Sequence, residues 1–138
     1  MPKKVHVYSD GGARGNPGPA AIGVLICTPE GEALQEHHEV IGESTNNVAE
    51  YTAVMVGLEI AKGLGAEEID YFLDSELVAK QLTGQFRVKA PHIQTLFKQV
   101  RGKVECFKRV KFSHVPRTHD KIRYVDRLVN QALNLAGS

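Results

Sequence analysis

The stretch Val5-His6-Val7-Tyr8-Ser9-Asp10-Gly11-Gly12-Ala13-Arg14-Gly15-Asn16-Pro17-Gly18-Pro19 decides the fold of this chain. Its first half alternates in the way that predicts a β-strand, and its second half is a turn rich in glycine and proline. Asp10 lies where the two halves meet, so we expect it at the edge of the strand. The glycines after it would leave room for a metal ion or a phosphate oxygen close to the backbone. The alternative is that Asp10 only starts the turn, a position that aspartate favours.

The size and composition of the chain predict one domain in a reducing compartment. Its 138 residues are enough for a single hydrophobic core, so we expect residues 1–138 to form one domain. Cys27 and Cys106 are the only cysteines, too few for a disulfide framework. With no leader peptide or long apolar run in view, we expect two buried free thiols, a cytoplasmic location and no membrane contact.

The net charge of +1 hides an uneven distribution along the chain. Residues 28–76 carry twelve acids and one base, whereas residues 84–127 carry twelve bases and three acids. This split predicts one surface for a polyanion and another for cations or solvent. Ordinary solvated faces remain the alternative explanation.

The rest of the pattern predicts four further strands with helices between them. We expect strands at residues 20–27, 32–41, 68–73 and 110–115, and the second of these, which is charged in its middle, should be an edge strand. Helices are expected from Ser44 or Thr45 to Gly63, from about 75 to 83, from Pro91 onward, and from about 122 to 135. This order predicts an α/β fold, a five-stranded mixed sheet whose first three strands are antiparallel and whose first strand is central, with helices packed on it.

Four acids stand out by their positions in these elements. Asp10 and Asp74 fall at strand ends, Glu50 in the first turn of a helix, and Asp126 early in the last helix. Helix capping by Asp74 and dipole stabilisation by Glu50 are the simpler interpretations. If the four converge, each close pair repels by about 1 kcal/mol in water and by several in a partly buried site. Two Mg²⁺ or Mn²⁺ ions about 4 Å apart would offset this repulsion and could hold both oxygens of a phosphoryl displacement.

Four segments of the chain resemble the signature blocks of the type 1 ribonuclease H family. They follow the family's order and span nearly the whole chain: Asp10–Ala20, Thr45–Tyr51, Asp74–Glu76 and Val125–Leu133. The resemblance implies a ribonuclease H-like fold and an endonuclease that hydrolyses the RNA strand of RNA/DNA hybrids. It also implies 5′-phosphate and 3′-hydroxyl products and no strong sequence preference, because groove width and phosphates carry little base information.

The resemblance also assigns roles to individual residues. The ligands of two Mg²⁺ ions, with Mn²⁺ as a substitute, would be Asp10, Glu50, Asp74 and Asp126. Asn16, Asn46 and Asn47 would line the minor groove, where small amides can reach the 2′-hydroxyls. Arg14 and Thr45 would lie near a phosphate of the DNA strand, and Ser75 and Lys89 complete the substrate-binding set. The residue that assists proton transfer or product release would be His114, with Arg117 and His119 as rivals.

Three departures from the family pattern limit these assignments. The family often has Gln where this chain has Glu76, which would repel a nucleic acid unless it is paired or turned away. The loop between His114 and Asp126 is about two residues longer than the family leads us to expect. Residues 84–111 are too few for a separate basic protrusion, so the DNA strand would be held from a plainer helix by Lys89, Lys98, Arg101 and Lys103.

Two other functions remain open at this point. A module that binds hybrids without cutting them needs the bases and the amides but gains nothing from four mutually repelling acids. A nuclease of the same fold could instead act on double-stranded RNA or on DNA junctions. The sequence gives no sign of an obligate protein partner, and we expect a monomer.

Overall fold

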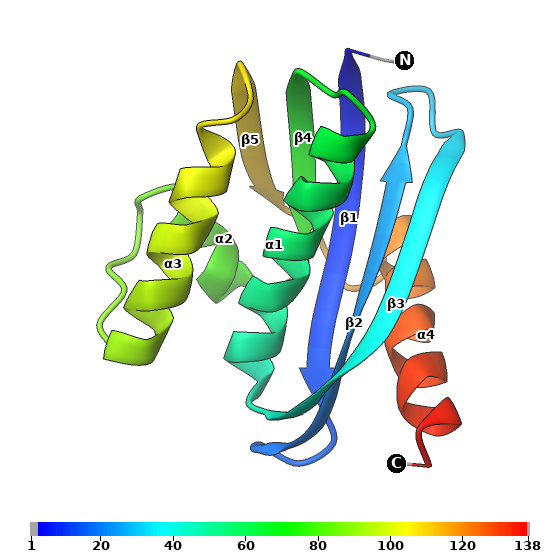
Figure 1. Cartoon of the computed structure of the whole chain (residues 1–138), viewed down its shortest axis with the longest axis vertical. Coiled ribbons are helices and arrows are strands. Elements are labelled where there is room, and N and C mark those ends of the chain that lie inside the picture. The colour runs from blue at the N-terminus through cyan, green and yellow to red at the C-terminus, as the bar shows by residue number, and fades with distance from the viewer. Residues whose placement is uncertain (1–2, 138) are drawn as a thin grey trace.

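The computed structural model describes residues 3–137 and places five strands and four helices among them (Figure 1). β4 has the bounds that the sequence predicts, and the other elements begin or end within a few residues of the prediction. In chain order the elements are β1 (Lys4–Ala13), β2 (Gly18–Cys27), β3 (Ala33–Ser44), α1 (Asn46–Gly63), β4 (Glu68–Leu73), α2 (Glu76–Leu82), α3 (Pro91–Val104), β5 (Arg109–His114) and α4 (Asp120–Leu135).

The five strands form one mixed sheet in the order β3-β2-β1-β4-β5. The β1–β2 and β2–β3 pairs are antiparallel, and the β1–β4 and β4–β5 pairs are parallel. The predicted fold class, the central position of the first strand and the edge position of the third are therefore confirmed.

Helices cover both faces of the sheet around β1. α1 and α3 lie on one face and α4 lies on the other (Figure 1). Val5 and Val7 of β1 belong to the larger core under α1, whereas Tyr8 belongs to a second core with Val125 and Leu128 of α4. Residues 7–11 of β1 are all buried, so side chains on either face of this stretch are covered by one of the two helical layers.

Asp10 lies inside β1, which corrects the expectation that the strand ends there. The antiparallel ladder pairs Asp10 with Gly23 and continues to Ala13 opposite Ala20. The glycines do not start the turn. A Cβ at position 11 would lie 2.2 Å from the backbone oxygen of Ala49, so the absence of a side chain at Gly11 lets α1 pack against β1.

Two smaller expectations are also wrong. Cys27 is buried, but Cys106 is exposed, because it lies in the turn that follows α3. α4 begins at Asp120 rather than near Ile122, because the ring of His119 accepts a hydrogen bond from the Lys121 N–H at 3.1 Å and caps the helix there. Within residues 3–137, none of the helices is both long and apolar enough to span a bilayer.

Candidate active site

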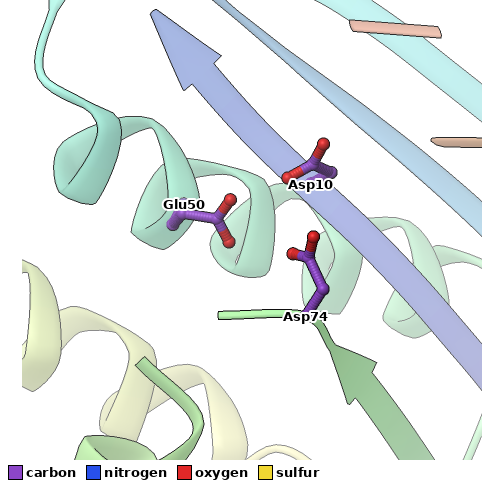
Figure 2. A group of neighbouring side chains, drawn as sticks. All are labelled: Asp10, Glu50 and Asp74. Atoms are coloured by element: carbon purple, nitrogen blue, oxygen red, sulfur yellow. The ribbon is translucent and has the colours of Figure 1, made fainter. Parts of the chain in front are cut away.

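Asp10, Glu50 and Asp74 bring their carboxyl groups together where β1, α1 and the end of β4 meet (Figure 2). One oxygen from each of them lies within 4.8 Å of the others. The sheet register accounts for two of the three. Tyr8 pairs with Phe72 across the parallel β1–β4 ladder, and Asp10 and Asp74 each follow that pair by two residues.

Glu50 is fixed by the start of α1. Thr45 caps this helix as predicted, its hydroxyl accepting a hydrogen bond from the Val48 N–H at 3.3 Å. One turn later, Glu50 Oε1 accepts a hydrogen bond from the Gly11 N–H at 3.2 Å. Its other oxygen, Oε2, is buried and has no hydrogen-bond partner among the residues described. A buried carboxylate oxygen without a partner is costly, and a bound cation would satisfy it.

Asp126 reaches the same place from the opposite face of the sheet. A Cβ at Gly23 would lie 2.6 Å from the Val125 oxygen, so α4 packs directly on the bare backbone of β2. Gly23 is the ladder partner of Asp10, and this contact places Asp126 beside Asp10. All four acids line one cavity of about 390 Å³, whose walls are Asp10, Gly11, Gly12, Asn46, Asn47, Glu50, Asp74, Ser75, Arg117 and Asp126.

The surroundings of Asp10, Glu50 and Asp74 disfavour the charged forms of these three carboxyl groups. Burial raises the pKa of Asp10 from 3.8 to about 7; a hydrogen bond with Glu50 opposes the rise, and the charges of Asp74 and Asp126 add to it. Burial, followed by the charge of Asp10, holds the pKa of Glu50 well above its usual range. Burial also raises the pKa of Asp74, although Arg117, whose Nε lies 3.5 Å from Asp74 Oδ2, counteracts part of this effect.

The cavity suits a hard divalent cation. Its ionisable ligands are carboxylate oxygens, the donor type that Mg²⁺ and Mn²⁺ prefer. The triad spacing, the unpartnered Glu50 oxygen and the raised pKa values all favour binding of a cation between these carboxyl groups. We conclude that Asp10, Glu50 and Asp74 could hold a metal ion, with Asp126 at the mouth of the cavity.

The three predicted groove asparagines lie next to the acids. Asn46 and Asn47 line the acidic cavity and also a second cavity of about 400 Å³, which Asn16 and Thr45 line as well. The Asn46 N–H donates to Asn16 Oδ1 at 3.0 Å, and Asn46 Oδ1 accepts from the Ala13 N–H at 2.9 Å. These bonds fix a ridge of exposed amides that joins the two cavities.

The other predicted substrate-binding residues, unlike the asparagines, lie at separate places on the molecule. Arg14 Nη2 donates to Asn134 Oδ1 at 2.7 Å, so Arg14 lies against α4. Ser75 lines the acidic cavity and caps α2, accepting from the Val78 N–H at 3.2 Å. Lys89 is exposed and lines neither of the two cavities.

The structure places Arg117, rather than His114, among the residues that line the acidic cavity. The β4–β5 ladder runs as far as Leu73 opposite His114, which keeps His114 in the sheet with an exposed side chain. The loop after β5 then brings Arg117 to Asp74. His119, the third candidate, caps α4 and packs against the ring of Tyr8 with 5.4 Å between ring centroids.

Two further residues qualify the sequence analysis. Glu76 is paired, since Lys80 Nζ lies 3.6 Å from its Oε1, so its charge is partly offset. Phe86, which the sequence analysis did not single out, is 44 % exposed in the basic loop before α3, and Lys80 Nζ lies 5.0 Å from its ring centroid. An aromatic residue inside a basic loop was the sequence signal that could have identified it.

Comparison with known proteins first shows the broad protein family to which this chain is similar. A family described as reverse transcriptase-like matches residues 8–132. The chain is 41 % identical over 134 residues to the bifunctional protein Rv2228c of Mycobacterium tuberculosis, a match that covers 96 % of this chain and 36 % of that protein. The chain thus spans about a third of the length of this relative.

Solved structures identify the family more closely. The crystal structure of RNase H1 from the archaeon Halobacterium salinarum matches with a TM-score of 0.91 and 39 % identity, covering 95 % of this chain and 98 % of that one. LC11-RNase H1 in complex with an RNA/DNA hybrid also matches with a TM-score of 0.91 and 39 % identity, covering 97 % and 99 % of the two chains. The chain belongs to the ribonuclease H1 family.

Proposed function

We propose that this chain is an endonuclease that hydrolyses the RNA strand of RNA/DNA hybrids. The observation that carries the proposal is the convergence of four carboxyl groups in one cavity beside a ridge of amides. Membership of the ribonuclease H1 family, one relative of which was solved with a hybrid bound, supports the choice of substrate.

Asp10, Glu50, Asp74 and Asp126 would hold two Mg²⁺ ions, or Mn²⁺ in their place. When bound, such ions would neutralise charge on the phosphate and supply an activated water. Bond formation between that water and phosphorus, with breakage of the bond to the 3′ oxygen, would leave 5′-phosphate and 3′-hydroxyl ends. The protein itself holds the four carboxyl groups in place. Three of them belong to β1, α1 and α4, and the fourth, that of Asp74, belongs to the link between β4 and α2. No N–H or hydroxyl group of the described residues donates to Glu50 Oε2, so a cation there would displace only the proton that Glu50 shares with Asp10.

The amide ridge selects the substrate. Asn16, Asn46 and Asn47 can donate to and accept from 2′-hydroxyls in a wide minor groove, which is where RNA differs from DNA. Ser75, which caps α2 inside the cavity, lies on the RNA side of this ridge in our proposal. None of these contacts reads base identity, so cleavage has no strong sequence preference.

The DNA strand would be held by bases and one aromatic ring rather than by a separate protrusion. Arg14 and Thr45 lie near the amide ridge and would contact a DNA phosphate. The exposed Phe86 ring offers a sugar or base a surface to stack on, and Lys89 adds charge to the same loop.

Arg117, rather than His114, is the residue that we propose assists catalysis or product release. It reaches the cavity from a loop, and its side chain is 89 % exposed, so it can move between Asp74 and a departing phosphate. The proposal also includes a single catalytic domain that acts as a monomer in the cytoplasm; free thiols at Cys27 and Cys106 fit a reducing compartment.

The test is cleavage of a labelled RNA/DNA hybrid at pH 8 with Mg²⁺, with Mn²⁺ and with EDTA. We expect cutting with either metal, no cutting with EDTA, and loss of activity by several orders of magnitude in Asp10→Asn. The same RNA in a double-stranded RNA and a four-way DNA junction serve as competing substrates. An intact hybrid in both metals, with a folded protein, would overturn the proposal, and preferential cutting of another substrate would change its substrate class.

A further inference from the structure

Asp126 differs from the other three acids in what holds its side chain. Asp10 and Glu50 are buried, and Asp74 is half-buried at the end of a strand, whereas Asp126 is exposed on the surface of α4. The packing of Val125 on Gly23 fixes the backbone at this point. This packing does not fix the direction of the Asp126 carboxylate. Neighbouring polar groups have to orient it.

Asn130 provides such a group one turn further along α4. Its Nδ2 lies 3.1 Å from the Asp126 backbone oxygen and 3.5 Å from Asp126 Oδ2. Its Oδ1 lies 3.4 Å from Arg14 Nη2. Arginine has only donors, so the contact with Arg14 requires the amide oxygen and leaves the NH₂ group for Asp126. Arg14 is held in turn by Asn134 at 2.7 Å.

We propose that Asn130 is a positioning residue that holds the Asp126 carboxylate toward the acidic cavity, with Arg14 fixing the orientation of the Asn130 amide. Polar groups that orient a metal-binding carboxylate from behind typically change metal affinity when they are removed. The network also joins the β1–β2 turn to the fourth acid, because Arg14 follows directly on β1. The inference rests on the proposed function, since it gives Asp126 a role at the metals.

The first test measures metal binding without substrate. Mn²⁺ is titrated into the full chain by isothermal calorimetry at pH 8, in wild type, Asn130→Ala and Gln131→Ala. Loss of one neutral hydrogen-bond donor predicts a Kd for Mn²⁺ that rises roughly threefold to tenfold in Asn130→Ala. Gln131→Ala is the matched control, because it removes an exposed side-chain amide from the next position of α4, which lies on a different row of the helix from Asp126, and its Kd should stay within about twofold. Both positions are exposed, and urea unfolding checks that both variants fold.

A second test asks whether Asn130 acts through Asp126. In an Asp126→Asn background, Asn130→Ala should change Mn²⁺ binding no further. In hybrid cleavage, the Mg²⁺ concentration for half-maximal rate should rise in Asn130→Ala by the factor seen for Mn²⁺, while the KM for the hybrid stays within about twofold.

The outcomes separate this inference from the proposed function. Equal Mn²⁺ affinity in wild type and Asn130→Ala, an equal loss in Gln131→Ala, or a full further loss in the Asp126→Asn background overturns the positioning role. If wild type leaves the hybrid intact but Asn130→Ala still weakens Mn²⁺ binding through Asp126, the positioning role stands and the proposed substrate fails.

Discussion

Replacing Asp10 by asparagine should stabilise the metal-free protein at alkaline pH. Burial raises the pKa of this carboxyl from 3.8 to about 7, so in the folded state its charged form is disfavoured. Three pKa units correspond to about 4 kcal/mol. Asparagine has nearly the same shape without the charge, and it should recover most of that free energy above pH 7.

The sign of the pH dependence follows from the same shift. Between about pH 4 and pH 7 the folded protein keeps a proton on Asp10 that the unfolded chain has lost, so wild-type stability falls as the pH rises through this window. Above about pH 7 Asp10 is charged in both the folded and the unfolded state, and the whole loss of folding free energy is present. The advantage of Asp10→Asn should therefore be about 4 kcal/mol at pH 8 and less than about 1 kcal/mol at pH 4.

Urea unfolding in EDTA at the two pH values measures both numbers. Asp70→Asn is the matched control, because Asp70 is the same residue type on β4 but lies 3.2 Å from Lys4 Nζ and 3.4 Å from His6 Nε2. That substitution removes an attraction and should not stabilise the protein. If Asp10→Asn is no more stable than wild type at pH 8, or gains as much at pH 4, the charge repulsion inferred for the cavity is wrong.

Three further outcomes follow from the same structure. Gly11→Ala should lose about 3 kcal/mol or more of unfolding free energy, because its Cβ would lie 2.2 Å from the Ala49 oxygen, and Gly12→Ala, whose nearest atom is 3.9 Å away, should unfold in urea much like wild type. Arg117→Ala should lower kcat for hybrid cleavage about tenfold or more and move the acidic limb of the pH–rate profile upward, since Arg117 lowers the pKa of Asp74. Phe86→Ala should raise the KM for the hybrid roughly fivefold with kcat unchanged, because only a stacking contact is lost, and an unchanged KM would remove Phe86 from the substrate surface.

Alternation and stop signals were sufficient to predict most of the fold. β4 was predicted with its observed bounds, because a run of strand length ends before Asp74 and a helix begins directly after it. The cap of that helix is Ser75, not Asp74 as the simpler interpretation had it. The end of β1 was not, since Gly11 and Gly12 look like the beginning of a turn when read locally. The glycine at position 11 is required by α1, which comes from 38 residues further along the chain and is invisible to any local pattern.

The acids of the candidate site could be selected from local features of the sequence, but the contacts between distant segments could not. The four acids could be picked out because strand ends and helix starts are local features, and the sheet topology then brings them together. The choice between His114 and Arg117 depended on where β5 stops pairing with β4, which the sequence does not specify. Asn130 could be placed on the row of Asp126 from its spacing, but its contact with Arg14 joins residues 116 positions apart.

The excess of negative charge in the cavity explains both its raised pKa values and its proposed chemistry. Of the described residues that line it, Arg117 is the one base, and it reaches Asp74 rather than the two buried acids. The charge that neutralises Asp10 and Glu50 must therefore come from outside the chain. In the metal-free protein below about pH 7 it comes from protons, because the pKa values of both carboxyl groups are raised; in the proposed enzyme it comes from divalent ions. Protons and metal then compete for the same oxygens, so metal affinity should rise as the pH passes through the region around 7, and binding below that pH should release protons.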